Sequence, residues 1–413
     1  MINDDQTDSS GGMREPKRPG GASVDYFVVK PGTLKAARDI AADRHMNSVH
    51  SAVREGGLTA AIAAYEGQDS PSLVVVEIEE DGEAALRQLD ALAETCLSTT
   101  RLIVIGPTDS VEFYKSLVDR GVSDYLVQPV ATGKLIAAIE ALIMPKNAKA
   151  RGRVIAVIGA TGGCGASTIA HNVAFKLANM FNAHTILADF DLHFGSVGLA
   201  FDLRAPQGLN QAVQAVERLD EVLLERLLAR HGANLKLLAG SAALAVADGH
   251  DQAPYERILD IAATIATFVV VDLPHEWSNV ARRVLHEADE IILTSPPTLA
   301  GLRNARHMFA AIRAMRPNDA DPRLVLNPTD MRKRAEVDAA FFEKTLNCAP
   351  SARIAFEPAV FSSSANEGKI ICEAFPSSAP VAAFEHLAKL VYGQRESAKS
   401  RSMLARLRHL LKR

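Results

Sequence analysis

The fold is decided by residues 153–178, which read RVIAVIGATGGCGASTIAHNVAFKLA. An apolar run typical of a buried strand leads into a glycine-rich turn, and a helical pattern follows. Gly162, Gly163 and Gly165 carry no Cβ atom, so the backbone here can bring successive N–H groups close to an anion. The helix that begins near Ser167 adds its N-terminal donors. The stretch therefore predicts a loop that binds phosphate.

Lysines expected in such a loop are missing. The pattern G-x-x-x-x-G-K-[ST] is broken at Ala160 and Ala166, which replace its first glycine and its lysine. Thr161 stands where a deviant form of the loop carries a further lysine. Each ammonium group would make a charge-assisted bond to phosphate worth about 1.5–3 kcal/mol. We therefore expect poor nucleotide affinity and at most slow hydrolysis, and a glycine turn that only packs helix on strand is the alternative.

Acidic side chains end two later strands. Asp189 and Asp191 lie in ILADFDLHFG, residues 186–195, and Asp272 lies in FVVVDLPH, residues 268–275. Because the carboxyl ends of parallel strands meet at one edge of a sheet, we expect these carboxylates to face the glycine-rich loop. Carboxylate and hydroxyl oxygens suit Mg²⁺. The order of the segments therefore predicts a site for a magnesium nucleotide.

Short apolar runs alternate with helical patterns on both sides of a short polar linker, residues 146–152. This alternation predicts an α/β domain over residues 24–145 and a larger one over residues 153–394, each with a parallel sheet covered by helices. Residues 1–23 are polar and contain glycine and proline, so we expect a disordered leader. Residues 395–413 form a basic tail.

The stretch 24–145 resembles the response-regulator receiver fold, a flavodoxin-like parallel sheet, in the order of its elements. Its chemistry differs, because the positions for an acidic pair, a phosphorylated Asp, a hydroxyl and a lysine hold Val29 with Lys30, Glu77, Gly106 and Gln128. We therefore expect no phosphorylation and interpret the domain as a protein-docking module. Glu77 is expected to be a strand-end acid that faces water, and a permanent mimic of the phosphorylated state is the alternative.

The chain as a whole resembles the TadZ/CpaE family of Tad/Flp pilus assembly proteins. The resemblance covers most of residues 24–390 and is carried by GATGGCGAST, DFDLHFGSVGLA, VVVDLPH and ADEIILTSPPTLAGLRNAR. That family is related to the MinD and ParA ATPases, and it usually has alanine where Ala166 stands. The resemblance implies a MinD/ParA-like P-loop domain, a doubly wound parallel sheet, behind a degenerate receiver-like domain.

The resemblance also assigns roles to residues. Asp191 would face the attacking water, with Asp189 as a second catalytic candidate. Ser167, Asp191 and Asp272 would hold Mg²⁺, in part through water. Asn327 would read the adenine edge, and the implied cofactor is ATP or ADP with Mg²⁺. The candidate nucleotide-binding residues are Gly162, Gly163, Cys164, Gly165, Ala166, Ser167, Thr168 and Asn327.

The function implied is that of a nucleotide-binding scaffold with weak or no ATP hydrolysis. It would be a cytoplasmic homodimer at the cell pole or the inner face of the cytoplasmic membrane, and it would recruit the pilus secretion ATPase and inner-membrane platform proteins. The rival is an active MinD/ParA-like ATPase that cycles between membrane or nucleoid and cytosol. That rival needs a substitute cation, for which Arg303, Arg306 and Lys369 are candidates. A phosphorylation-gated regulator is a third possibility, and for it we expect no acyl phosphate.

The composition fits a soluble chain, with 48% apolar and 23% charged residues among 413. Lys and Arg total 45 against 49 Asp and Glu, a net charge of −4, so we expect no specific nucleic-acid partner. The four cysteines contain no C-x-x-C pair, which argues against a zinc site and fits a reducing cytosol. We find no secretory signal and no run of about 20 apolar residues, and expect a cytoplasmic protein.

The basic tail ends in SMLARLRHLLKR, in which leucines recur at helical spacing between cations. A basic amphipathic helix of this kind can lie on an anionic membrane surface. A terminal helix that packs its leucines on the protein itself is an equal alternative.

Overall fold

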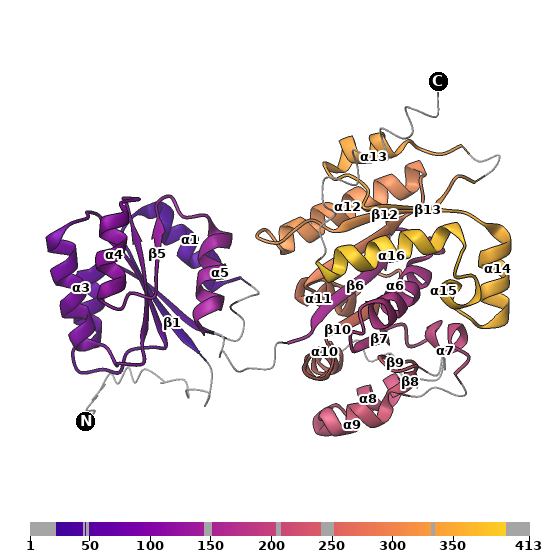
Figure 1. Cartoon of the computed structure of the whole chain (residues 1–413), viewed down its shortest axis with the longest axis horizontal. Helices are drawn as coiled ribbons and strands as arrows, with labels where there is room; N and C mark the ends of the chain where they lie inside the picture. The colour runs from indigo at the N-terminus through magenta and orange to yellow at the C-terminus, as the bar shows by residue number, and fades with distance from the viewer. Residues whose placement is uncertain are drawn as a thin grey trace, which may run out of the picture. The chain divides into compact units, whose positions relative to one another are not determined.

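The computed structural model describes residues 22–43, 46, 49–143, 151–203, 208–240, 252–331 and 335–393. The chain divides into two compact units, Met1–Asn147 and Ala148–Arg413 (Figure 1). The predicted leader and linker fall almost entirely outside the described residues, and the predicted tail falls wholly outside them. No described helix combines the length and apolar content needed to cross a bilayer.

The first unit is a five-stranded parallel sheet in the order β2-β1-β3-β4-β5. Its elements are β1 (Ser23–Val28), α1 (Pro31–Ala41), β2 (His50–Glu55), α2 (Gly57–Tyr65), β3 (Leu73–Glu77), α3 (Glu83–Thr95), β4 (Arg101–Gly106), α4 (Val111–Asp119), β5 (Asp124–Val127) and α5 (Thr132–Ile143). Strand β3 reads LVVVE and is buried along its whole length, as expected for a central parallel strand with helices on both faces. Helices α1 and α5 pack on one face of the sheet, and α2, α3 and α4 pack on the other (Figure 1).

Glu77 corrects one expectation, because it does not face water. The side chain is 1% exposed and accepts four hydrogen bonds at the carboxyl edge of the sheet. Oε2 accepts from the backbone N–H groups of Val29 at 2.6 Å and Lys30 at 2.9 Å. Oε1 accepts from the Thr33 hydroxyl at 2.6 Å and the Gln128 amide at 2.7 Å. The carboxylate is therefore an internal tie between the ends of β1 and β5 and the start of α1.

Gly106, at the end of β4, shows why no hydroxyl stands there. A Cβ atom built on Gly106 would lie 2.6 Å from the Tyr125 hydroxyl oxygen, which itself donates to the Thr108 carbonyl at 2.7 Å. Any side chain at position 106 would displace that tyrosine.

The second unit is an eight-stranded sheet in the order β13-β12-β11-β6-β10-β7-β9-β8. All neighbouring strands are parallel except β8, which runs antiparallel to β9 at the edge. The strands are β6 (Arg153–Gly159), β7 (Thr185–Asp189), β8 (Ala229–His231), β9 (Leu235–Leu238), β10 (Phe268–Asp272), β11 (Glu290–Ser295), β12 (Arg323–Thr329) and β13 (Ala352–Ala355).

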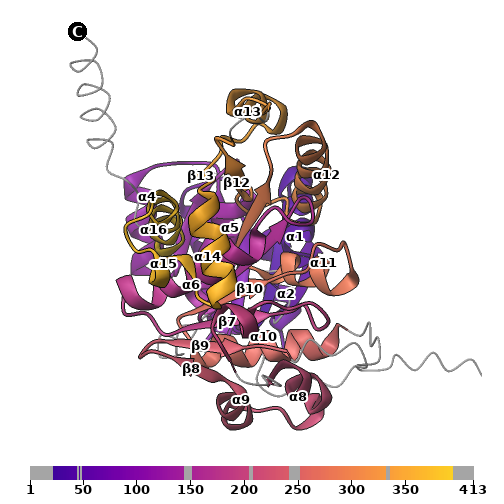
Figure 2. The ribbon, with the colours of Figure 1, turned by 90° about the vertical axis from the view of Figure 1, so that its right-hand side faces the viewer.

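Helices cover both faces of this sheet. Their bounds are α6 (Ala166–Met180), α7 (Val197–Ala200), α8 (Gly208–Gln214), α9 (Glu221–Leu227), α10 (Ala253–Ile265), α11 (Asn279–Glu287), α12 (Leu299–Met315), α13 (Ala339–Leu346), α14 (Pro358–Glu367), α15 (Ile371–Ala374) and α16 (Ala379–Tyr392), and a 3-10 turn spans Val216–Arg218. Helices α6, α15 and α16 pack on one face, and α10, α11 and α12 pack on the other (Figure 2). The predicted α/β class with helix-covered parallel sheets is confirmed.

The central strand β6 lies between β11 and β10. After β6 the chain forms α6 and enters β7, which lies two strands from β6 on the side of β10. Strand β11 lies on the other side of β6. Such a switch point leaves a crevice at the carboxyl ends of the strands, where ligands of open α/β sheets bind.

Candidate nucleotide-binding site

A cavity of about 390 Å³ lies at the carboxyl edge of the eight-stranded sheet. It is lined by the glycine-rich loop, by the start of α6 and by the segments that follow β7 and β10. The lining residues are Gly159, Thr161, Gly163, Cys164, Gly165, Ala166, Ser167, Thr168, Asp189, Asp191, Phe194, Gly195, Ser196, Asp272, Leu273, Pro274 and His275. The structure thus brings together nine of the eleven predicted site residues, and Gly162 and Asn327 are the two that do not line the cavity.

The loop needs glycine at two positions. Gly163 has φ of +71° and Gly165 has φ of +82°, a region that side-chain-bearing residues rarely adopt. Gly165 is also the N-cap of α6, and a Cβ atom built there would lie 2.3 Å from the side-chain nitrogen of Asn327. The glycines therefore shape the turn that directs the N-terminus of α6 at the cavity.

Side chains from three neighbouring segments hold the backbone carbonyls of the loop. The Asn327 amide donates to the Cys164 carbonyl at 2.7 Å, and the Asn304 amide donates to the Ala160 carbonyl at 2.9 Å. His275 Nδ1 lies 2.8 Å from the Gly159 carbonyl oxygen. Asn327 is buried, and its amide supports the loop in this structure. The sequence did not predict a role for His275 or Asn304. The position of His275, three residues after Asp272, is the one signal that could have indicated it.

Asp189 shapes the segment that follows β7. Its Oδ1 accepts from the backbone N–H of Asp191 at 3.2 Å and its Oδ2 from that of Val197 at 3.0 Å. A Cβ atom on Gly195 would lie 2.6 Å from Oδ2, so only glycine fits beside it. Burial, reinforced by the neighbouring Asp272, raises the pKa of Asp189 to about 7. Both oxygens of Asp189 are thus used to fold the loop.

Asp191 and Asp272 have oxygens left for a cation. Asp191 is half-buried, and its Oδ1 accepts from the backbone N–H groups of His193 at 3.2 Å and Phe194 at 2.8 Å. Asp272 is 3% exposed, and its Oδ1 has no hydrogen-bond partner among the described residues. Its Oδ2 lies 3.7 Å from Nε2 of the buried His171. A buried carboxylate oxygen without a donor is costly in an interior, and a hydrated cation would satisfy it.

These residues fit a magnesium nucleotide in part. Ser167, Asp191 and Asp272 would hold Mg²⁺, and the backbone of the loop with the N-terminus of α6 would receive phosphate oxygens. Among the described residues no three His, Cys, Asp or Glu side chains gather to hold a metal alone, so phosphate and water would complete the shell. When bound, Mg²⁺ would neutralise phosphate charge. The described lining of the cavity contains neither Lys nor Arg.

The candidate substitute cations lie elsewhere. Arg303 and Arg306 are exposed on α12, where the Arg303 guanidinium donates to the side-chain oxygen of Asn304. Lys369 lines a separate cavity of about 160 Å³, which shares Ser167 and Thr168 with the nucleotide cavity. Its ammonium lies 3.5 Å from a Glu367 carboxylate oxygen. Lys369 is therefore linked to the nucleotide cavity through shared lining residues.

The similarity of this chain to known proteins covers parts of its length. No protein-family model matches the chain. An uncharacterized protein of Mycobacterium tuberculosis is 25% identical over 221 residues, which are 52% of this chain and 60% of that protein. The chain thus spans about 60% of the length of this curated relative.

Two solved structures are similar to parts of the chain. A pilus assembly protein CpaE from Caulobacter crescentus is 39% identical, over 29% of this chain and 98% of that chain, with a TM-score of 0.29. A ParA family ATPase from Chlorobium tepidum matches with a TM-score of 0.53 at 24% identity, over 57% of this chain and 98% of that chain. The chain therefore contains the P-loop ATPase fold of the ParA and MinD proteins.

Proposed function

We propose that this protein is a scaffold of the TadZ/CpaE type, which binds a magnesium nucleotide weakly and helps to assemble a Tad/Flp pilus. The proposal rests on the motifs of the second unit, which has the P-loop fold, and on the smaller α/β first unit that precedes it in the chain. In this role the protein is cytoplasmic and acts at the cell pole or at the inner face of the membrane. Its partners are the pilus secretion ATPase and inner-membrane platform proteins.

The charge of the nucleotide cavity carries the proposal. Three carboxyl groups line the cavity, those of Asp189, Asp191 and Asp272, and its described lining offers no Lys or Arg to oppose them. Mg²⁺ offsets part of this negative charge, but no side-chain ammonium stabilises the charge that develops on phosphate oxygens during hydrolysis. The site would therefore hold a nucleotide weakly and is poorly suited to cleaving it.

Exposed apolar side chains support dimerisation across the same edge of the sheet. Phe194 is 76% exposed, Leu299 is 71% exposed and Trp277 is 41% exposed, and they follow β7, β11 and β10 respectively. Large apolar residues exposed at one edge of a sheet are typical of an interaction surface. We propose that a second copy of the chain covers them.

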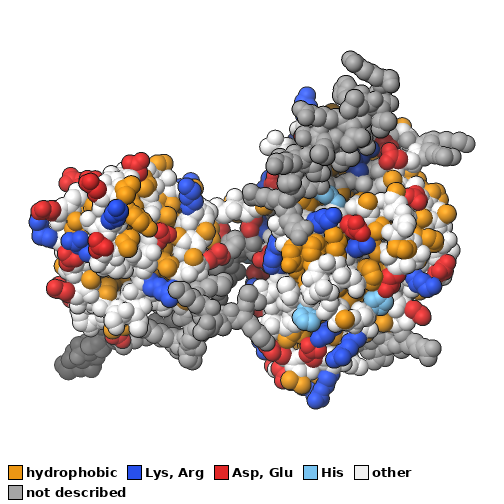
Figure 3. Space-filling view, in the orientation of Figure 1, with side chains coloured by type: hydrophobic (Ala, Val, Ile, Leu, Met, Phe, Trp, Pro, Cys, Tyr) orange, Lys and Arg blue, Asp and Glu red, His pale blue; other side chains and the backbone are white. Residues whose placement is uncertain are grey.

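Charge is mixed on the face of each unit that Figure 3 shows, where acidic and basic side chains are interspersed. The net charge is −4. This distribution favours protein partners over a nucleic acid, because protein surfaces that bind nucleic acid concentrate positive charge.

Calorimetric titration with ATP and Mg²⁺ tests the site, and pilus formation in the native host tests the role. We expect wild-type protein to bind nucleotide and Asp191→Ala and Ser167→Ala to lose binding. Deletion of the gene should abolish surface pili, and the wild-type gene should restore them. Normal piliation in the deletion strain would refute the assembly role, while absence of binding in wild type would leave a scaffold without nucleotide.

A further inference from the structure

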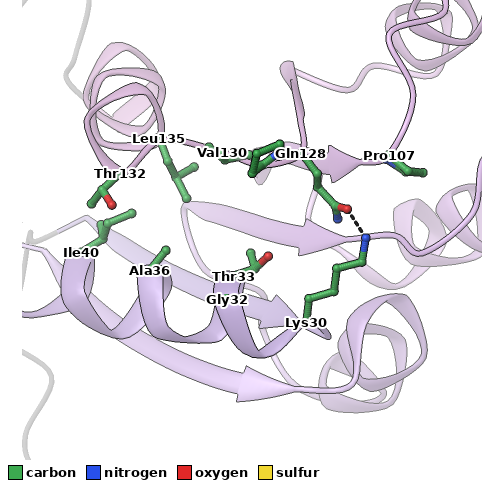
Figure 4. Close-up of a pocket in the computed structure, with 11 residues that line it drawn as sticks. Lys30, Gly32, Thr33, Ala36, Ile40, Pro107, Gln128, Val130, Thr132 and Leu135 are labelled. Atoms are coloured by element: carbon green, nitrogen blue, oxygen red, sulfur yellow. Dashed lines mark hydrogen bonds between the residues drawn. The ribbon is translucent and has the colours of Figure 1, made fainter.

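A second cavity, of about 610 Å³, opens in the first unit between α1 and α5 (Figure 4). It lies at the carboxyl edge of the five-stranded sheet, where Lys30 follows β1 and Gln128 follows β5. Its volume is in the range of small-molecule sites, about 300–1,000 Å³. The lining residues are Lys30, Gly32, Thr33, Ala36, Ile40, Pro107, Gln128, Pro129, Val130, Thr132 and Leu135.

The wall of this cavity is divided by polarity. Ile40 of α1 and Leu135 of α5 stand at one end with Ala36 of α1 beside them, and Thr132 of α5 is the polar side chain drawn at that end (Figure 4). The ammonium group of Lys30 and the amide of Gln128 meet at the other end, joined by a hydrogen bond. A ligand that fills this space therefore needs an apolar body and one polar head.

The polar end of the cavity carries the Lys30 ammonium, which makes no direct ion pair within the described part of the chain. Lys30 donates to the neutral side-chain oxygen of Gln128, and no ion pair of Lys30 is found among the described residues. The nearby carboxylate of Glu77 is 1% exposed, and its two oxygens already accept four hydrogen bonds. Glu77 thus has no oxygen to spare for Lys30. Among the described residues Lys30 has no carboxylate partner, and its exposed side chain can pair with an incoming anion.

The first turn of α1 adds donors at the same end. Gly32 lines the cavity and lies in this turn, where backbone N–H groups have no partner within the helix. The turn itself contains no acidic side chain, but Glu77 of β3 already accepts from the Lys30 N–H and the Thr33 hydroxyl at its start. The Lys30 ammonium is therefore the group at this end that would bind an anionic head.

We propose that this cavity binds a small amphipathic carboxylate, with its carboxylate on Lys30 and its apolar body between α1 and α5. The proposal concerns the first unit only and is independent of the nucleotide site. Bound there, the ligand would touch Lys30, Thr33 and Gln128, three of the residues whose groups hold Glu77. It would therefore stiffen the edge of the sheet that Glu77 ties together.

Octanoate is a suitable probe, with octanol as its uncharged counterpart. Methyl NMR of the full chain reports the location of binding, because Ile40 lines the cavity and Ile155 lies in the other unit. We expect octanoate to shift the Ile40 methyl signal saturably and to leave that of Ile155 unchanged. Octanol should bind more weakly by about tenfold or more, since it cannot pair with Lys30.

Single substitutions separate the contribution of the charge from that of the cavity volume. Lys30→Gln should weaken octanoate by about tenfold or more while leaving octanol unchanged. Ala36→Leu fills the cavity and should abolish binding of both octanoate and octanol. If the methyl spectrum shows that Ala36→Leu unfolds the first unit, Thr132→Leu serves as the cavity-filling variant instead. Lys35→Gln is the matched control, because Lys35 is exposed on α1 and does not line the cavity. The proposal is overturned by no saturable Ile40 shift in wild type, by equal octanoate affinity in Lys30→Gln, or by unchanged binding when the cavity is filled.

Discussion

The side-chain nitrogen of Asn327 lies 2.7 Å from the carbonyl oxygen of Cys164, a hydrogen bond that ties the glycine-rich loop to β12. The bond is buried, and it crosses from the sheet to the turn that precedes α6. The shape of the loop therefore depends on a residue that does not line the cavity.

Replacing Asn327 with Ala should destabilise the second unit by about 1–3 kcal/mol, because a buried carbonyl loses its donor. The chain has one tryptophan, Trp277, and it lies in this unit, so its fluorescence in a denaturant titration measures the loss. Asn179→Ala is the control, since Asn179 is exposed and its amide bonds only within α6. Equal effects of the two changes would contradict the supporting role of Asn327.

The stability of the second unit should fall as pH rises. The pKa of Asp189 is raised by burial and by Asp272 to about 7, above the value of about 3.9 in an unfolded chain. Between these values the folded state holds a proton that the unfolded state has lost, so stability present at acid pH is lost by neutrality, by up to about 4 kcal/mol.

Asp189→Asn should remove this dependence, because the amide does not ionise. Unfolding free energies of both proteins, measured at intervals from pH 4.5 to 8 with Trp277 fluorescence, give the comparison. Parallel pH profiles would show that Asp189 is not the group responsible.

Removing the Glu77 carboxylate should unfold the first unit at lower denaturant. Glu77→Ala leaves four donors without an acceptor, which should cost at least about 3 kcal/mol, and Glu77→Gln should cost less because its amide oxygen retains some of these bonds. Far-UV circular dichroism follows the unfolding of the first unit. The relevant denaturant concentrations are those at which the fluorescence of Trp277, in the second unit, has not yet changed. A wild-type midpoint for Glu77→Ala would mean that the carboxylate faces water after all.

Restoring the loop lysine should strengthen nucleotide binding. Ala166→Lys places an ammonium group in the cavity and should raise affinity for ATP with Mg²⁺ by about 10- to 100-fold, from a bond worth about 1.5–3 kcal/mol. Calorimetry measures the change. Ala310→Lys adds the same charge at an exposed position of α12 that does not line the cavity, and it should leave affinity unchanged. An unaltered affinity in Ala166→Lys would show that the missing charge is not what limits binding.

The sequence predicted the α/β organisation and the meeting of Asp189, Asp191 and Asp272 with the loop. Both follow from local signals, because buried parallel strands are continuously apolar and their carboxyl ends share one edge of a sheet. A glycine-rich turn between such a strand and a helix has few alternative shapes. These parts of the site could be placed without knowing any side-chain contact.

Other features depend on contacts between distant segments and could not be predicted. The burial of Glu77 follows from donors in two distant segments, residues 29–33 and Gln128, which no local pattern indicates. Asn327 bonds to a carbonyl 163 residues away, so its direction is set by packing. His275 and Asn304 hold loop carbonyls in the same way. In each case the missing information is the direction of a polar side chain at a strand or helix end.

Phosphate release by the full-length wild-type protein, in ATP and Mg²⁺ and in the presence of the membrane and protein partners proposed for it, tests the central claim most directly. A cavity lined by three carboxyl groups and no described Lys or Arg predicts release no faster than that of Asp191→Ala. Rapid release that Asp191→Ala abolishes would contradict the account and identify the protein as a working ATPase.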